Sequence, residues 1–395
     1  MRAGKKVKIT GIQADWKHPT HIRFGVERLK ELPDVCWNLG ACSPLLVTDH
    51  GVAKLPVVQT IRSLNREQSI ETGLFSALTG EPDQDCVRQG AEYFRKNGHD
   101  SIIAIGGGSA LDAGKAIALA GAVGPKGLWS YRTDNPHPPG MARPIPPIIA
   151  IPTTTGTGSE VDANAVITQA ETNRKISLFH KDLLPGVVIA DPTLTRRLNP
   201  FLTAATGMDA LSHNLEALCS PVFQPILDGI AIHALGLIKD WLPRAFHQGR
   251  NLEARTYTMA ASIMGAMAFE KGLGAAHAVA HALGSAAKIH HGRAVGALLP
   301  FVLKMNQRAV TPKMAHLARN LGLPGQDFQA VLNWILDLRH ELGLPASLGE
   351  LGIKQAHIPT IVESALTDVN LSTNPIPVTA NQLQRLLQKA VQGKL

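Results

Sequence analysis

The pattern of the chain changes near residue 196, and this change constrains the fold more than any other feature. Before it, short apolar runs alternate with helical patterns; the runs are PLLVTD (44–49), SIIAIGG (101–107), PPIIAIP (146–152) and GVVIADP (186–192). This alternation predicts a parallel sheet covered by helices on both faces. From about Phe201 onward, Ala/Leu-rich stretches with helical periodicity follow one another. We therefore predict an α/β domain over residues 1–196 and an all-helical domain over residues 197–395.

Composition narrows the class of protein. The 395 residues are 45% hydrophobic and 18% charged, as in ordinary soluble globular proteins. The net charge is +8, but the basic residues are scattered, so we expect phosphorylated cofactors or acidic substrates and no nucleic acid. The basic start lacks an apolar signal segment, and no run approaches the roughly 18 apolar residues that span a bilayer. Four cysteines without CxxC spacing indicate reduced thiols in the cytoplasm; they are Cys36, Cys42, Cys86 and Cys219.

A glycine turn joins the second apolar run to a helical pattern. The turn contains Gly106, Gly107, Gly108 and Ser109, and SALDAGKAIALA follows. A helix N-terminus with bare backbone N–H groups is an anion site, so a phosphate or pyrophosphate is the expected ligand. The spacing differs from the GxGxxG fingerprint because Leu111 stands at the third position. A plain βα turn, with glycines only for close packing, is the alternative.

Two further stretches would also contact the cofactor if the turn binds a dinucleotide. Asp49 ends the first apolar run, where an acid can accept hydrogen bonds from the adenosine ribose and disfavour a 2′-phosphate. An Asp in TDHG is otherwise a turn former. PTTTGTGSE (152–160) follows the third run and offers hydroxyls for ribose, phosphate or the nicotinamide amide; by itself it would be a capped loop.

The helical half contains two pairs of possible metal ligands. Asp209 and His213 stand four residues apart, as do His277 and His281, so each pair shares a helix face. His291 follows shortly after. One carboxylate with three of these imidazoles would suit iron(II), zinc, manganese or nickel. Each pair alone is weak evidence, because such spacing also occurs as a local hydrogen bond on a helix surface.

Taken together, the motifs resemble the iron-containing, group III alcohol dehydrogenase family. The matching stretches are GGGSxxDxxK (106–115), PTTxGTGSE (152–160), GMDALSH (207–213), GLGxxHxxxH (272–281) and HG (291–292). The resemblance implies an N-terminal dinucleotide-binding domain, a C-terminal helical domain and a metal in the cleft between them. It implies the metal ligands Asp209, His213, His277 and His291, and His281 as a proton relay near the nicotinamide. It also implies cofactor contacts from Asp49, Gly106, Gly107, Gly108, Ser109, Asp112, Thr153, Thr154, Thr157 and Lys175.

The chain departs from this family at two places. The doubled His290 and His291 leave open which histidine is the ligand, and the position next to Gly292 favours His291. Lys271 stands where many members are neutral. It would either receive a carboxylate substrate or be an exposed lysine at a helix end. Asn164 and Phe269 are candidates for the lining of the substrate pocket.

We therefore expect a metal-dependent NAD(P)-linked alcohol dehydrogenase or aldehyde reductase, acting on a short-chain alcohol, hydroxy acid or semialdehyde. Metal coordination would lower the pKa of the alcohol, and hydride would pass to the nicotinamide. The cofactors would be NAD, with NADP possible, and Fe²⁺, with Zn²⁺ possible. A homodimer or higher homo-oligomer is expected. A glycerol dehydrogenase, a dehydroquinate synthase and a non-catalytic metal- or nucleotide-binding protein are the alternatives.

Overall fold

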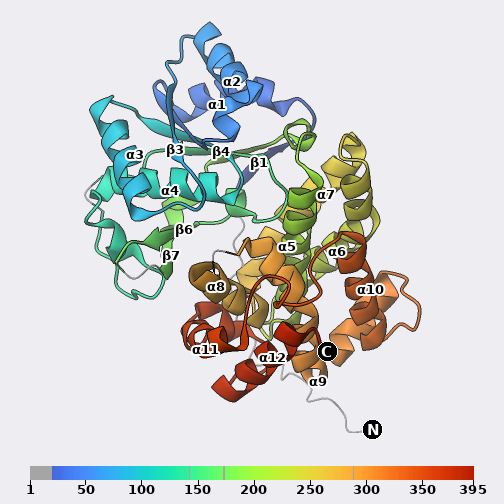
Figure 1. The fold of residues 1–395 in the computed structure, drawn as a ribbon. Coiled ribbons are helices and arrows are strands. Elements are labelled where there is room, and N and C mark those ends of the chain that lie inside the picture. Colours follow the sequence, from blue (N-terminus) through green and yellow to red (C-terminus); the bar gives the residue numbers. More distant parts are fainter. Residues whose placement is uncertain (1–19, 142, 172–173, 288) are drawn as a thin grey trace, which may run out of the picture.

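A parallel sheet forms the centre of the N-terminal half. The computed structural model describes residues 20–141, 143–171, 174–287 and 289–395 (Figure 1). The sheet has the order β1-β8-β5-β4-β2-β3, and all neighbouring strands are parallel. In that order the strands are His21–Phe24, Val187–Ala190, Ile148–Pro152, Ser101–Gly106, Pro44–Asp49 and Gly73–Leu78. The sheet confirms the predicted α/β class.

Alternating side chains place the sheet between two layers of helices. Ile103 and Ile105 of β4 point to the face covered by α1 (Leu32–Leu39) and α2 (Pro56–Glu67). Ile102 and Ala104 point to the opposite face, covered by α3 (Gln84–Lys96) and α4 (Gly108–Val123). Figure 1 shows these two pairs of helices on opposite sides of the sheet. Because both faces are buried, the inner strands contain almost only apolar residues.

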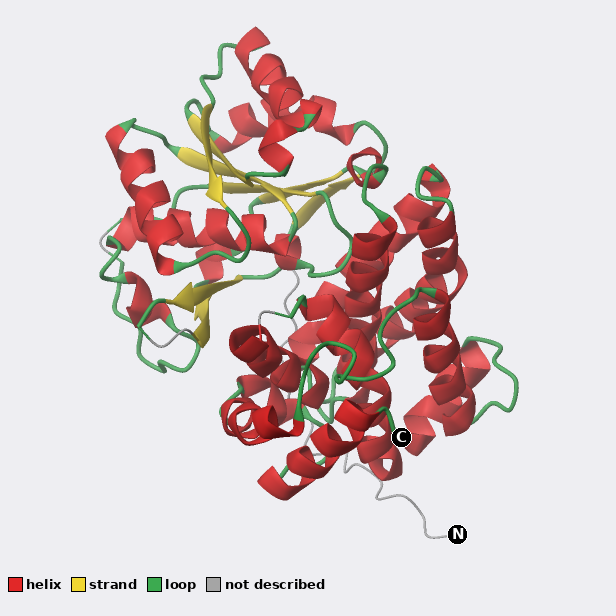
Figure 2. Cartoon of the chain, viewed as in Figure 1, coloured by secondary structure: helices red, strands yellow, loops and turns green. Residues whose placement is uncertain are grey.

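Four strands in this half have weaker sequence signals. β1 and β3 are the two edges of the sheet, and each has exposed or half-buried positions that interrupt the apolar pattern. β6 (Asn164–Gln169) and β7 (Arg174–Phe179) form a separate antiparallel hairpin, visible apart from the main sheet in Figure 2. The hairpin follows the PTTTGTGSE stretch, so it continues the segment that leaves the carboxyl end of β5.

Helices make up the C-terminal half, as expected from its periodicity (Figure 2). They are α5 (Pro200–Cys219), α6 (Pro225–His247), α7 (Leu252–Ala268), α8 (Ala275–Ala287), α9 (His291–Asn320), α10 (Phe328–Glu341), α11 (Ile358–Leu366) and α12 (Ala380–Gln392). The centre of this bundle is α5, which is buried without interruption from Thr203 to Cys219. In the described ranges, no helix combines the length and the apolar character that crossing a membrane requires. The boundary between residues 196 and 197 stays a prediction, and residues 1–19 lie outside the described chain.

Candidate active site

Three helices bring one carboxylate and three imidazoles to a single point. Asp209 and His213 lie one turn apart on α5, His277 is in the first turn of α8, and His291 begins α9. The Nε2 atoms of His213, His277 and His291 lie 3.8, 3.6 and 3.5 Å from Oδ1 of Asp209. The ligand atoms of Asp209, His213 and His277 all lie within 4.8 Å of one another. Three of the four residues named from the sequence therefore surround a carboxylate oxygen of the fourth, Asp209.

Two polar atoms in this cluster have no partner among the described residues. Oδ1 of Asp209 and Nε2 of His277 are buried and make no hydrogen bond. Buried polar atoms are normally hydrogen-bonded, so this unpaired set indicates a site for a ligand. Carboxylate oxygen and imidazole nitrogen are ligands of Fe²⁺ and Zn²⁺. The donor set thus fits a divalent transition-metal ion.

Burial and neighbouring charges oppose each other in the cluster. Burial would raise the pKa of Asp209, but the facing histidines hold that pKa below its ordinary range. Burial lowers the pKa of His213 to about 4 despite the attraction of Asp209, so its ring is neutral near neutral pH. Burial also lowers the pKa of His277, but the carboxylates of Asp209 and Glu216 outweigh it and raise the pKa to about 9. A metal ion at Nε2 of His277 would displace the proton that faces Asp209, while the proton on Nδ1 would stay with Glu216.

Outer hydrogen bonds orient two of the rings. Nδ1 of His277 donates to Oε2 of Glu216 at 2.6 Å, and Nδ1 of His213 donates to the carbonyl oxygen of Gly156 at 3.1 Å. Both bonds leave Nε2 directed toward Asp209. Sequence reasoning missed Glu216, although it stands seven residues after Asp209. That spacing, two helical turns, is the signal that could have found it.

Two glycines allow the backbone contacts on which the cluster depends. A Cβ on Gly292 would lie 2.1 Å from the carbonyl oxygen of Ala205, so only glycine lets the start of α9 pack against α5. A Cβ on Gly156 would lie 2.6 Å from the carbonyl oxygen of Thr206. The HG and GTG motifs therefore place His291 and the carbonyl partner of His213 against the same helix.

His281 lies one turn after His277 and has a different environment. Its side chain is 31% exposed, and its Nδ1 donates to Oδ2 of Asp368 at 2.8 Å. The rings of His281 and His291 stack with centroids 5.3 Å apart. Burial would raise the pKa of Asp368, but the hydrogen bond from His281 lowers it. Sequence reasoning missed Asp368, which is 87 residues away and begins a short helical turn, Val369–Thr373.

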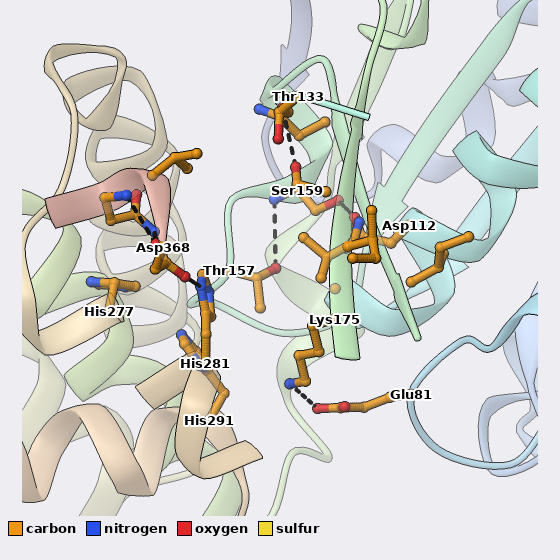
Figure 3. Close-up of a pocket in the computed structure, with 18 of the residues that line it drawn as sticks. Glu81, Asp112, Thr133, Thr157, Ser159, Lys175, His277, His281, His291 and Asp368 are labelled. Carbon is orange, nitrogen blue, oxygen red and sulfur yellow. Dashed lines mark hydrogen bonds and ion pairs between the residues drawn. The ribbon is translucent and has the colours of Figure 1, made fainter. Parts of the chain in front are cut away.

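A cavity of about 560 Å³ connects these histidines with the glycine turn. Figure 3 shows His277, His281 and His291 on the helical wall, and Ser159 and Asp112 on the opposite wall. Of the residues predicted from the sequence, the following line the cavity: Gly108, Ser109, Asp112, Thr157, Lys175, Asp209, His213, His277, His281 and His291. Asn164 and Phe269 line it too. The four predicted metal ligands and five of the ten predicted cofactor residues thus line one space.

The glycine turn lies at the carboxyl end of the sheet and opens α4. β4 ends at Gly106, whose φ of 148° suits glycine, and α4 begins at Gly108 without a side-chain cap. Asp112 lies farther along α4, where its carboxylate accepts hydrogen bonds from the Ser159 hydroxyl and the Val166 N–H. Asp112 therefore connects α4 to the segment that carries the hairpin. Its contact with the cofactor stays a prediction.

Five predicted cofactor residues are not among those that line this cavity: Asp49, Gly106, Gly107, Thr153 and Thr154. Oδ1 of Asp49 accepts hydrogen bonds from the N–H groups of Gly51 and Val52 at 2.8 and 2.9 Å, so Asp49 does form a turn. Thr154 lies against Gly107. Thr153 lines a second cavity, described below, and its N–H donates to the carbonyl oxygen of Gly106 at 2.9 Å.

Two lysines differ in their relation to the main cavity. Lys175 lines it and forms an ion pair with Glu81 at 2.6 Å. Lys271 is 1% exposed, is paired with Asp228 and is not among the lining residues. Both expectations for Lys271 were wrong, because the turn before α8 directs its side chain inward to a carboxylate of α6. His290 is exposed and packs its ring against Phe201, whereas His291 faces Asp209.

Comparisons with known proteins match both halves of the chain. The model of the iron-containing alcohol dehydrogenase family matches residues 19–192, and the model of the C-terminal part of the Fe-containing alcohol dehydrogenase family matches residues 203–391. The chain is 36% identical over 383 residues to 4-hydroxybutyrate dehydrogenase of Cupriavidus necator, covering 94% of this chain and 98% of that one.

Solved structures give the same result. A 1,3-propanediol oxidoreductase superposes with a TM-score of 0.88 at 34% identity, covering 96% of this chain and all of that chain. Sulfoacetaldehyde reductase from Bifidobacterium kashiwanohense, solved in complex with NAD⁺, has a TM-score of 0.87 at 31% identity and covers 96% and 99%. The family models match both halves of the chain, and the relatives cover more than nine tenths of it: the chain belongs to the iron-containing alcohol dehydrogenase family.

Proposed function

We propose that the chain is an NAD-linked, metal-dependent dehydrogenase that interconverts a small alcohol and its aldehyde in the cavity between the sheet and the helices. One observation carries the proposal: three imidazoles surround a buried Asp209 oxygen without a hydrogen-bond partner among described residues, on the wall of the cavity that the glycine turn also lines. In domain terms, residues 1–196 would bind the dinucleotide and residues 197–395 the metal.

Asp209, His213, His277 and His291 would hold the ion, and Glu216 would position His277. When bound, Fe²⁺ or Zn²⁺ supplies Lewis acidity that lowers the pKa of the substrate hydroxyl, and NAD supplies a hydride acceptor. The backbone at Gly106–Ser109 would bind the pyrophosphate at the start of α4. The hydroxyls of Thr153, Thr154 and Thr157 and the ammonium of Lys175 would contact the rest of the cofactor.

His281 would carry the substrate proton to solvent. It lies one turn from His277, is partly exposed and has its Nδ1 proton held by Asp368. Its Nε2 is therefore the atom that exchanges the proton, and Asp368 is a positioning residue.

The substrate would be a short-chain alcohol or aldehyde, including a hydroxy acid or its semialdehyde. The named activities of the 4-hydroxybutyrate and 1,3-propanediol enzymes support this class. Four free cysteines support the cytoplasm as the location. Exposed apolar side chains between α5 and α6 and at the start of α6, namely Val222, Phe223 and Ile226, support a homo-oligomer.

Metal analysis of anaerobically prepared protein, coupled to an aldehyde panel with NADH, tests the proposal. The panel should contain unsubstituted short aldehydes and acidic semialdehydes. We expect about one Fe²⁺ or Zn²⁺ per chain and NADH oxidation that chelation abolishes. Metal-free protein with full activity would contradict the assignment, and sedimentation would decide the oligomeric state.

A further inference from the structure

A second cavity of about 460 Å³ lies beside the glycine turn. It is lined by Leu55, Pro56, Val57, Thr153, Thr193, Leu194, Arg196, Arg197 and Arg250. Thr153 connects this cavity to the turn, because its N–H donates to the Gly106 carbonyl. Gly108 and Ser109, at the other end of the same turn, line the cavity of the histidines. The glycine turn therefore lies between the two cavities.

Three arginines give the second cavity a concentrated positive charge. Arg196 and Arg197 follow the turn Pro192–Thr195, and Arg250 lies between α6 and α7. All three are exposed, and none of their guanidinium groups has a hydrogen bond or ion pair with another described residue. The described residues that line the cavity include no Asp or Glu. Three unpaired guanidiniums around one space favour an anionic ligand.

A fourth arginine fixes the two segments that carry them. Arg255 is fully buried and donates to the carbonyl oxygens of Gly249 and Leu198 at 2.9 and 3.0 Å. These carbonyls belong to the residues next to Arg250 and Arg197. Its third hydrogen bond, at 2.9 Å, goes to the hydroxyl of Thr203 at the start of α5. The arginines therefore stand on backbone that is held in place before any ligand binds.

The remaining lining suits a nucleobase and a phosphate. Leu55, Val57 and Leu194 provide an apolar wall against which a flat ring can pack. α2 also begins at this cavity and has no side-chain cap at its N-terminus. A dinucleotide with its pyrophosphate at the glycine turn must place its nicotinamide toward the histidines. Its adenosine then reaches the second cavity.

We propose that Arg196, Arg197 and Arg250 bind the 2′-phosphate of NADP(H), so that this chain uses NADPH as well as NADH. The inference rests on the dinucleotide position in the proposed function. Asp49, at the same end of the cofactor, would repel a 2′-phosphate. However, its Oδ1 accepts two backbone N–H groups, and the residue does not line this cavity. Because the arginines have no carboxylate partner, a phosphate could pair with them without displacing one.

The cofactor preference of arginine variants tests the proposal. For the wild type and for Arg196→Gln/Arg197→Gln and Arg250→Gln, kcat/KM is measured with NADPH and with NADH. We expect the ratio of the NADPH value to the NADH value to fall by about tenfold in each variant. Arg385→Gln, which removes an exposed and unpartnered arginine on α12, is the control and should leave the ratio unchanged. Equal ratios in all four proteins, or an equal fall in the control, would overturn the proposal.

A binding measurement separates this proposal from the activity. Titration calorimetry with adenosine 2′,5′-bisphosphate and with 5′-AMP requires neither metal nor substrate. We expect the bisphosphate to bind the wild type about tenfold more tightly than AMP, and the double variant to lose this difference. Equal binding of the two ligands by the wild type would refute the arginine site even if NADH turnover is normal. Tighter binding of the bisphosphate without NADH turnover would instead leave the site intact and refute the proposed function.

Discussion

The helical wall of the cavity and the wall formed by the sheet would hold their ligands in different ways. On the helical wall, the side chains converge on one buried oxygen, and two of them have fixed partners: Glu216 for His277 and the Gly156 carbonyl for His213. On the sheet wall, Gly108 and Ser109 of the glycine turn present backbone, and Ser109 and Thr157 present small hydroxyl side chains. Side-chain ligands select a metal by chemistry, whereas backbone N–H groups accept any phosphate that fits. Substitutions on the helical wall should therefore impair metal binding, whereas substitutions on the sheet wall should impair cofactor binding.

The largest expected effect is on the helical wall. His277→Ala should abolish metal binding and lower kcat/KM by more than about a thousandfold, because it removes one of the proposed ligands beside Asp209. Metal content by mass spectrometry and NADH oxidation measure the two losses. His290→Ala is the matched control: this neighbouring histidine is exposed and packs on Phe201, so metal and activity should stay. Full activity in His277→Ala would remove the basis for the metal site.

His281→Ala should separate chemistry from metal binding on the same helix. We expect the wild-type metal content and a kcat about a hundredfold lower, because the proton relay is lost. Asp368→Asn should lower kcat less, since the amide can still position the ring. Loss of metal from His281→Ala would show that His281 is a metal ligand and not a separate proton relay.

A substitution in the glycine turn should affect only the cofactor. A Cβ on Gly108 would lie 2.7 Å from Cγ2 of Thr157 and would push that side chain toward the cofactor. Gly108→Ala should raise the KM for NAD by about tenfold and leave the metal content unchanged. Gly121→Ala, on the same helix, is the control because its Cβ would meet Phe94 at an ordinary 3.4 Å. An unchanged KM in Gly108→Ala would mean that the cofactor does not approach this turn.

The smallest expected effect is on the pH dependence of the free energy of unfolding, through the buried Glu160. Burial raises the pKa of Glu160 to about 7 from an ordinary value of 4.5. The folded protein therefore keeps this proton while the unfolded chain releases it. The stabilisation is complete below pH 4.5, and about 3 kcal/mol is lost as the pH rises to about 7. Glu160→Gln should flatten this part of the pH profile in denaturant unfolding. Parallel profiles for both proteins would contradict the prediction.

The sequence predicted local chemistry better than it predicted contacts between distant residues. The Asp209/His213 pair and the four apolar strands are regular patterns within a few residues, so their spacing alone was informative. The edge strands β1 and β3 were missed because exposed positions interrupt their apolar pattern. Asp368 was missed because its link to His281 depends on how a distant turn packs against α8. Lys271 was misplaced because its partner, Asp228, lies 43 residues upstream on another helix.

The burial of α5 has a consequence for engineering this enzyme. The helix that carries Asp209 and His213 is also the centre of the helical core, and Gly292 and Gly156 contact its backbone directly. A core substitution that shifts α5 by a few tenths of an ångström would move two ligands relative to the two on α8 and α9. Selection for heat resistance through this core would therefore change metal affinity at the same time. Thermostability would be easier to improve independently at the surfaces of α10 and α12.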